Sequence, residues 1–354
     1  MTAFSWLTAF IAFVSALLFA FPVRRLARRF DWVDHPTGER KTHARAIPYG
    51  GGLAIVLGMG AGILTTLFTP PALLASGTRL WAIVLGVMLT LLIGSIDDAR
   101  GLGPWTKLYA QIAIGLGMWF AGFRVEKVTN PLGGVIHFGG FGAPLTVLWY
   151  VAVMNAMNLI DGLDGLACGV AAIAGMTILG ISARWSEPQT MMLSAIFVGA
   201  CLGFLPHNFH PARQFLGDGG SLTLGFCLAT LSMATGTKST AMLAMLVPMV
   251  ALLIPVADAI AVFTRRLKHG QHPFRGDQRH LHHRLLRIGL THRRVVLIFY
   301  YWSGVNGVLA YLLASATPLE QSSSAGVFLV FVLQAAGFLL LLESLSLLES
   351  RNLK

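Results

Sequence analysis

The sequence predicts an all-α fold, a polytopic bundle of about 11 transmembrane helices in a single domain that covers residues 1–354. Of the 354 residues, 55% are hydrophobic and 12% are charged, whereas soluble domains carry about 25% charged residues. Apolar runs also recur along the whole chain, each close to the roughly 20 residues that a helix needs to cross the hydrocarbon core. The composition therefore argues against a water-soluble fold.

Each apolar run is expected to form one membrane-spanning helix. The first run has no basic segment before it and no small-residue cleavage site after it, which predicts a retained helix rather than a signal peptide. The expected spans are residues 4–23, 50–69, 79–96, 107–123, 143–160, 165–183, 189–206, 221–236, 240–263, 295–315 and 324–345.

The distribution of basic residues predicts the orientation of the bundle. If the N-terminus lies outside, 21 of the 26 Lys and Arg residues fall in inner segments, as expected for cytoplasmic loops. We therefore expect an outer N-terminus and a cytoplasmic C-terminus. The net charge of +11 is then mainly a topology signal. Nucleic-acid binding is the weaker interpretation, since a basic inner face also attracts anionic lipids and nucleotide phosphates.

Acidic residues gather on the predicted inner side. Asp97 and Asp98 end the third span, Asp161 and Asp164 lie between the fifth and sixth spans, and Asp218 precedes the eighth. Any one of them could merely cap a helix. Several carboxylates at one membrane depth repel one another and are expensive near hydrocarbon. A divalent cation would relieve that repulsion, so the pattern predicts a metal site.

A glycine-rich turn surrounds the last of these carboxylates. The segment 217–221 reads Gly-Asp-Gly-Gly-Ser and leads into the eighth span. The free N–H groups at a helix N-terminus favour phosphate, so this turn is a candidate phosphate site. A plain loop before a membrane helix is the alternative.

The longest predicted inner loop, about 264–294, is basic and rich in histidine. It contains the run Arg279, His280, Leu281, His282, His283 and Arg284. We interpret the run as an anion site in which histidine and arginine bind phosphate or pyrophosphate. A zinc site is disfavoured by the basic surroundings and the lack of a nearby cysteine. A juxtamembrane helix that touches lipid headgroups is a further alternative.

Four ordered segments carry a resemblance to a known family. They are residues 97–102 (DDARGL), 155–167 (NAMNLIDGLDGLA), 208–212 leading to 217–221 (NFHPA, GDGGS), and 280–283 (HLHH). Together they resemble the polyprenyl-phosphate N-acetylhexosamine-1-phosphate transferases of glycosyltransferase family 4, which are related to phospho-N-acetylmuramoyl-pentapeptide transferase. The resemblance covers most of the chain.

The resemblance implies both a fold and a reaction. The implied fold has ten or eleven spans with a cleft at the inner leaflet. The implied reaction transfers a sugar 1-phosphate from a UDP-sugar to undecaprenyl or another polyprenyl phosphate, releases UMP and needs Mg2+ or Mn2+. The His-x-His-His form with flanking arginines is more similar to the N-acetylglucosamine branch.

The biological setting follows from the same resemblance. An enzyme of this branch would start the synthesis of a cell-envelope polysaccharide, such as lipopolysaccharide or a wall polymer, in the bacterial cytoplasmic membrane. Its partners would be the two substrates and membrane lipids, without nucleic acid. Whether the chain forms a homodimer is left open.

The resemblance also implies residue roles. Asp218 is the expected principal metal ligand, with Asp98 as a second ligand, directly or through water, and Asp97 matches a residue proposed as base or nucleophile. We favour direct attack, because a phosphomonoester with a second pKa of about 6 is already largely dianionic near neutral pH. His282 and His283 complete the expected catalytic set. The expected substrate-binding residues are Lys107, Asn155, Asn158, Asp161, Asp164, Asn208, Arg279, His280 and Arg284.

One residue departs from the family pattern. Gly219 stands where the family more often has Thr or Val, which affects the packing of its loop.

The alternative class of protein is a transporter or lipid flippase, which would place ionisable groups near the bilayer midplane on broken helices. The acidic residues here gather at one interface instead, which favours the enzyme.

Overall fold

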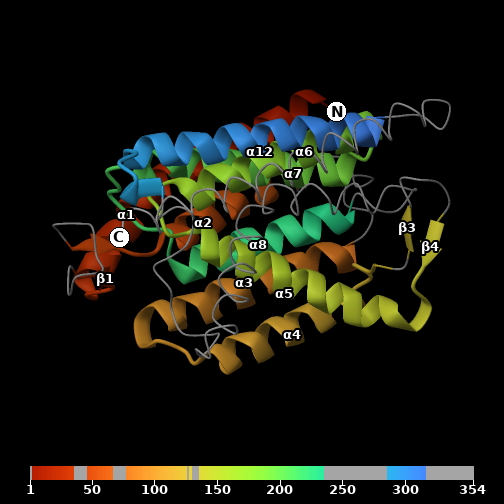
Figure 1. Cartoon of the computed structure of the whole chain (residues 1–354), viewed down its shortest axis with the longest axis horizontal. Coiled ribbons are helices and arrows are strands. Elements are labelled where there is room, and N and C mark those ends of the chain that lie inside the picture. Colours follow the sequence, from red (N-terminus) through yellow and green to blue (C-terminus); the bar gives the residue numbers. More distant parts are fainter. Residues whose placement is uncertain are drawn as a thin grey trace, which may run out of the picture.

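The computed structural model describes residues 2–35, 46–66, 77–125, 127–129, 135–234 and 285–315. Long helices run side by side along the longest axis (Figure 1). They are α1 (Thr2–Arg29), α2 (Gly51–Thr65), α3 (Gly77–Arg100), α4 (Pro104–Phe120), α5 (Gly142–Ile160), α6 (Leu166–Arg184), α7 (Pro188–Asn208), α8 (Gly217–Ala234) and α12 (His292–Ser315). The short strand pairs are β1 (Val33–Asp34) with β2 (Ile47–Pro48), and β3 (Lys127–Thr129) with β4 (Val135–His137).

The predicted all-α membrane fold is confirmed. Nine of the expected spans correspond to these helices, and the spans expected at 240–263 and 324–345 lie outside the described residues. In the described part of the chain, six helices are long and apolar enough to cross a membrane. Boundaries that differ by four or more residues include the end of α1, which continues through the arginines to Arg29, and the end of α3, at Arg100 rather than 96. They also include the start of α8, at Gly217 rather than 221.

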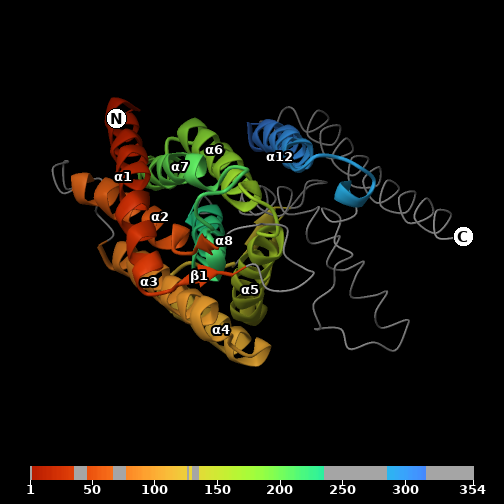
Figure 2. The ribbon, with the colours of Figure 1, turned by 90° about the vertical axis from the view of Figure 1, so that its left-hand side faces the viewer.

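Helix α8 lies in the middle of the bundle (Figure 2), where it contacts α2, α3, α5, α6 and α7. It is buried along almost its whole length. Its hydroxyl groups find partners inside the protein, as the absence of water in a bilayer requires. The indole of Trp149 on α5 donates to Ser232 Oγ, 3.2 Å away, and Tyr150 shares a hydrogen bond of 3.1 Å with Thr230.

The outer helices show the reverse of a soluble pattern. Large apolar side chains on them are exposed, including Trp81 on α3 and Phe120 on α4, at 74% and 77%. Apolar side chains that would be costly in water are stable against lipid tails. The exposed faces are therefore those expected of a protein surrounded by a bilayer.

The polar residues of interest gather at one end of the bundle. The C-terminal end of α3 and the N-terminal ends of α8 and α12 lie at the end where β1 is found, and the β3–β4 pair lies at the opposite end (Figure 1). Close packing of α3 on α8 fixes this end. A β-carbon on Gly94 would lie 2.4 Å from the Asp218 carbonyl oxygen, so only glycine lets the two backbones approach this closely.

Candidate active site

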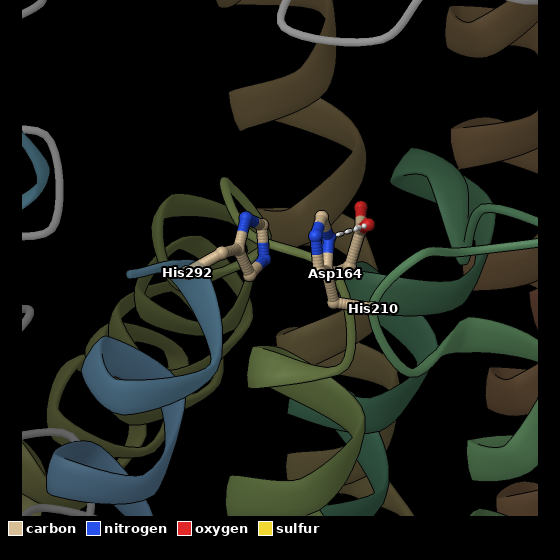
Figure 3. A group of neighbouring side chains, drawn as sticks. All are labelled: Asp164, His210 and His292. Carbon is tan, nitrogen blue, oxygen red and sulfur yellow. Dashed lines mark hydrogen bonds and ion pairs between the residues drawn. The ribbon is translucent and has the colours of Figure 1, made fainter. Parts of the chain in front are cut away.

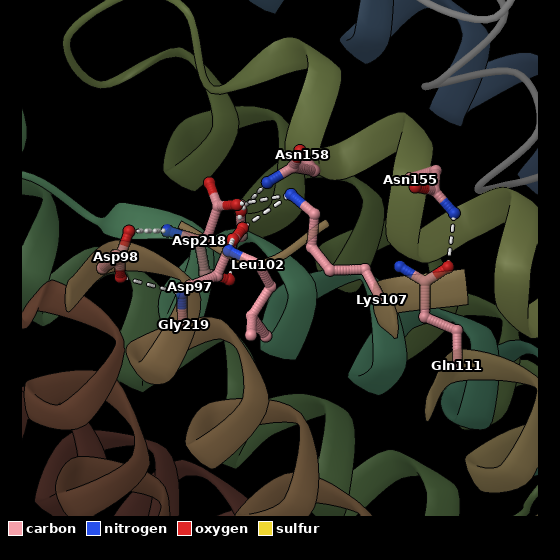
Figure 4. A network of polar contacts seen from close by, with 10 residues as sticks. Asp97, Asp98, Leu102, Lys107, Gln111, Asn155, Asn158, Asp218 and Gly219 are labelled. Atoms are coloured by element: carbon pink, nitrogen blue, oxygen red, sulfur yellow. Dashed lines mark hydrogen bonds and ion pairs between the residues drawn. The ribbon is translucent and has the colours of Figure 1, made fainter. Parts of the chain in front are cut away.

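Three aspartates and one lysine meet at this end of the bundle, and we call Asp97, Asp98, Asp218 and Lys107 the carboxylate centre. The Lys107 ammonium on α4 donates to Asp97 Oδ2 on α3 at 2.6 Å and to Asp218 Oδ2 on α8 at 3.1 Å (Figure 4). The other oxygen of Asp97 accepts a hydrogen bond from the Leu102 backbone N–H. The predicted convergence of carboxylates from separate helices is confirmed.

Asp98 has a different environment from its neighbour Asp97. Its two oxygens accept hydrogen bonds from the backbone N–H groups of Asp218 at 2.8 Å and Gly219 at 3.2 Å. These are donors at the N-terminus of α8, so Asp98 on α3 caps α8 from outside. Capping of this kind satisfies N–H groups that have no partner within their own helix.

This capping corrects the expectation that free N–H groups at residues 217–221 would bind phosphate. Two of those groups are already bound to the protein's own carboxylate, and the segment belongs to the first turn of α8. Gly217 permits the arrangement in two ways. Its φ angle is 75°, and a β-carbon on it would lie 2.5 Å from Asp98 Oδ2.

Gly219, the departure from the family pattern, also lies in a crowded place. A β-carbon on it would lie 2.8 Å from Ser95 Oγ and 3.2 Å from the Ser95 backbone nitrogen. Glycine therefore lets the first turn of α8 rest directly on α3. The packing of the turn is where this departure has its effect.

A fourth carboxyl group lies in the same region. Asp161 directly follows α5, and burial raises the pKa of its carboxyl group, with a further increase from the charges of Asp218 and Asp98. Within the described ranges, Lys107 is the cation that pairs with the carboxylate centre. Carboxylate oxygens are the ligands that Mg2+ prefers, so an all-oxygen donor set with excess negative charge fits a divalent cation.

Two of the predicted donor-binding asparagines lie beside the centre on α5. The Asn158 amide donates to Ser221 Oγ at 3.0 Å, and the Asn155 amide donates to Gln111 Oε1 at 2.6 Å. Gln111, which the sequence reasoning missed, is buried on α4. A polar residue one helical turn after Lys107 in an apolar run was the signal that could have identified it.

The structure places Asp164 in the loop after α5 and Asn208 at the C-terminal end of α7. Asn208 is 2% exposed; it accepts a hydrogen bond from the Gly165 N–H and donates one to the Gln214 carbonyl, both of 3.1 Å. Asp164 pairs with His210, a residue that occurs in a family segment but was given no role. The donor-binding role of Asp164 and Asn208 stays a prediction.

The remaining predicted residues lie outside the described residues. They are Arg279, His280, His282, His283 and Arg284. Their proposed binding of phosphate therefore stays a prediction as well.

A helical membrane bundle with a carboxylate centre at one end defines the class, a polytopic membrane protein with the chemistry for phosphoryl transfer. The chain belongs to glycosyl transferase family 4, whose model matches residues 80–236. It is 35% identical over 328 residues to a probable undecaprenyl-phosphate N-acetylglucosaminyl 1-phosphate transferase of Bacillus subtilis, covering 92% of this chain and 88% of that protein.

Two further relatives have similar names. The chain is 35% identical to the decaprenyl-phosphate N-acetylglucosaminephosphotransferase of Mycobacterium tuberculosis, over 87% of this chain and 81% of that protein. It is 29% identical to the undecaprenyl-phosphate alpha-N-acetylglucosaminyl 1-phosphate transferase of Escherichia coli K12, over 88% of this chain and 82% of that protein. The family predicted from the four sequence segments is thereby confirmed.

Proposed function

We propose that this chain transfers N-acetylglucosamine 1-phosphate from UDP-N-acetylglucosamine to a polyprenyl phosphate and releases UMP. The observation that carries the proposal is the carboxylate centre, in which Lys107 joins Asp97 and Asp218 from separate helices at one end of a membrane bundle. The relatives, named for the same sugar and for undecaprenyl or decaprenyl phosphate, support the choice of substrates.

The proposed chemistry is a displacement at phosphorus. An oxygen of the lipid phosphate forms a bond to the sugar-linked phosphorus of the donor, and the bond from that phosphorus to the bridging oxygen breaks. UMP leaves with the bridging oxygen and its electron pair. Both substrates are anionic, so the protein's main tasks are charge neutralisation and alignment.

The surroundings of Asp97 favour direct attack by the lipid phosphate over a covalent aspartyl intermediate. Its side chain is 7% exposed, and its two oxygens accept hydrogen bonds from Lys107 and from the Leu102 N–H. A carboxylate held on both oxygens is a poor nucleophile. Asp97 therefore positions Lys107, and the ammonium of Lys107 would hold a substrate phosphate.

Mg2+ or Mn2+ is the proposed cofactor, with Asp218 as the principal ligand and Asp98 as a second, directly or through water. When bound, the ion would neutralise charge on the donor pyrophosphate. The Asp218 carboxylate suits this role because its contact with Lys107 is the longer of the two and 31% of the side chain is exposed. The two asparagines on α5 and the Asp161 carboxylate would bind donor hydroxyl groups.

We infer that the carboxylate centre faces the cytoplasm of a bacterium, since nucleotide sugars are cytoplasmic substrates and 21 of 26 basic residues fall in the segments assigned to that side. The product would be the first lipid-linked intermediate of a cell-envelope polysaccharide. A homodimer would be compatible with this function.

One assay tests the proposal. The purified protein in detergent is given a polyprenyl phosphate, Mg2+ and one UDP-sugar from a panel, and UMP release is measured together with the lipid product. UDP-N-acetylglucosamine should give UMP and a lipid-linked sugar in equal amounts, and omission of the lipid should stop both. UMP release that does not depend on the lipid, or turnover with every sugar except this one, would refute the proposed reaction.

A further inference from the structure

A second polar cluster lies beside the carboxylate centre and is formed by Asp164, His210 and His292, which we call the histidine cluster. Asp164 is in the loop after α5, His210 in the loop after α7, and His292 is the first residue of α12. One candidate ligand atom from each residue lies within 4.8 Å of those from the other two. Figure 3 shows the two imidazole rings face to face, with the Asp164 carboxylate beside His210.

Hydrogen bonds hold this cluster in place before any ligand binds. His210 Nδ1 is 2.8 Å from Asp164 Oδ2, which also accepts the Ala212 N–H at 3.0 Å. The guanidinium of Arg293 donates to the His210 carbonyl oxygen at 3.2 Å, so its charge is directed at the backbone rather than at the rings. The rings themselves stack with centroids 4.1 Å apart and planes 14° apart.

One nitrogen of the cluster has no partner within the described part of the chain. His292 Nε2 is buried and makes no hydrogen bond. Buried polar atoms of native proteins almost always have a partner. Two stacked imidazoles cannot both be imidazolium cations without repulsion, so a second proton on each ring does not supply the missing partner.

We propose that Asp164, His210 and His292 bind a transition-metal ion of the Zn2+ type. Two imidazoles and one carboxylate favour borderline metals such as Zn2+ and Co2+ over Mg2+, which prefers oxygen. Metal–ligand bonds of about 2.0–2.2 Å place neighbouring ligand atoms about 3–3.5 Å apart. His210 Nδ1 and Asp164 Oδ2 are 2.8 Å apart and already lie close enough to share an ion. The ligand atom of His292, which lies within 4.8 Å of the other two, must approach by about 1 Å, and rotation of the His292 ring can provide this.

The ion would take the place of the proton that His210 and Asp164 share. It would join three segments that are far apart in sequence: the loop with Asp161, the loop that leads to Asp218, and the start of α12. This site differs from the proposed Mg2+ site in its donor atoms and in every one of its residues. The inference does not rest on the proposed transfer reaction, because ion binding can be measured without either substrate.

Co2+ binding provides the test, with the full-length protein in detergent after treatment with a chelator. Co2+ bound to nitrogen and oxygen ligands absorbs visible light through d–d transitions, so a titration with CoCl2 alone gives affinity and stoichiometry. One Co2+ should bind per chain, and Zn2+ but not millimolar Mg2+ should displace it. Absence of a saturable spectrum would overturn the proposal.

Variants decide where the Co2+ binds. His292→Ala and His210→Ala should each weaken binding by about 100-fold or more, because each removes a direct ligand and loss of an outer-shell partner alone costs 10- to 100-fold. His35→Ala is the matched control, since His35 lies at a partly exposed position outside the cluster, and Asp218→Asn should also leave Co2+ affinity unchanged. The double variant His282→Ala/His283→Ala tests the histidine-rich loop. Loss of the spectrum in that variant but not in His292→Ala would overturn the proposed site.

A second measurement covers the case in which a variant fails to fold. X-ray absorption of the Zn2+-loaded wild-type protein should give two imidazole ligands at about 2.0–2.1 Å and at least one oxygen ligand. A shell without imidazole, or with more than two imidazoles, would exclude this set of ligands.

Discussion

The carboxylate centre and the histidine cluster lie at the same end of the bundle but differ in the partners that their polar atoms have within the protein. In the carboxylate centre, Lys107 pairs with both Asp97 and Asp218, and backbone N–H groups donate to both oxygens of Asp98. In the histidine cluster, one buried imidazole nitrogen makes no hydrogen bond. Within the described residues, the first group thus has hydrogen-bond partners but more carboxylates than cations, whereas the second leaves one buried nitrogen without a hydrogen bond.

The two proposed cation sites differ in their donor atoms and should therefore bind different kinds of ion. An all-oxygen group with its own ammonium can exchange that ammonium for substrate and a hard cation. A group of two imidazoles and one carboxylate suits a softer metal that stays bound. Residues of the first group should therefore control turnover and the Mg2+ requirement, and residues of the second should control binding of Zn2+ or Co2+.

The largest expected effect is at the carboxylate centre. Asp218→Asn should lower UMP release by about 100-fold or more, because it removes the charge of the proposed principal metal ligand and one of the two carboxylates paired with Lys107. Activity of the wild type should also disappear in excess EDTA and return with Mg2+. Asp31→Asn is the control, since the Asp31 side chain is 81% exposed. Near-normal turnover of folded Asp218→Asn would remove this residue from the active site.

His282 and His283 in the basic loop test whether a further group of residues binds the metal ion or, as we expect, phosphate. His282→Ala or His283→Ala should reduce the rate or the donor affinity by roughly 10- to 100-fold, because each loses a charge-assisted hydrogen bond to phosphate. The Mg2+ concentration needed for half-maximal rate should not change. A large rise in that concentration, with rate at saturating Mg2+ intact, would make these histidines metal ligands instead.

Asp98 caps α8 and is also the proposed second metal ligand, so its replacement tests both roles. Asp98→Asn keeps one acceptor oxygen but loses the charge that caps α8, so we expect about 1–2 kcal/mol of lost stability and roughly a 10-fold loss of rate. The Mg2+ requirement of the rate distinguishes the two roles. If it rises strongly, Asp98 is a metal ligand as the family resemblance implied; if it does not, capping of α8 is its main role.

Much of this fold could be predicted because long apolar runs in the sequence identify membrane-spanning helices. A run of about 20 apolar residues has few alternatives in a bilayer, so the sequence located α1 to α8 and α12 with errors of a few residues. The start of α8 was placed late, since Gly217, Gly219 and Gly220 have low helix propensity. Tertiary contacts overrule that propensity, as Asp98 caps the first turn from α3.

The composition of the site could be predicted, but its pairings could not. Aspartates at three predicted helix ends indicated a common centre, yet nothing in the pattern says that Lys107 joins Asp97 to Asp218 or that Asp98 binds backbone. His292 shows the same limit. In the sequence it lies near the end of the predicted basic loop 264–294 as an ordinary polar residue, and only the folded chain brings it to Asp164 and His210.

The smallest expected effect comes from the packing of α3 on α8, which should influence the carboxylate centre and leave the histidine cluster unchanged. Gly94→Ala places a β-carbon 2.4 Å from the Asp218 carbonyl oxygen and the Gly219 nitrogen, so α3 and α8 must move apart, at a cost of about 1–3 kcal/mol. Activity should fall by a few-fold as Asp98 and Asp218 shift. Gly117→Ala on α4 is the matched control, because a β-carbon there meets nothing within 4 Å. Co2+ affinity should be unchanged in both variants, since the atoms nearest a β-carbon on Gly94 belong to Asp218 and Gly219 of α8 and a β-carbon on Gly117 meets nothing within 4 Å. If Gly94→Ala weakens Co2+ binding as much as it lowers turnover, the carboxylate centre and the histidine cluster move together. The claim that they are independent sites would then be wrong.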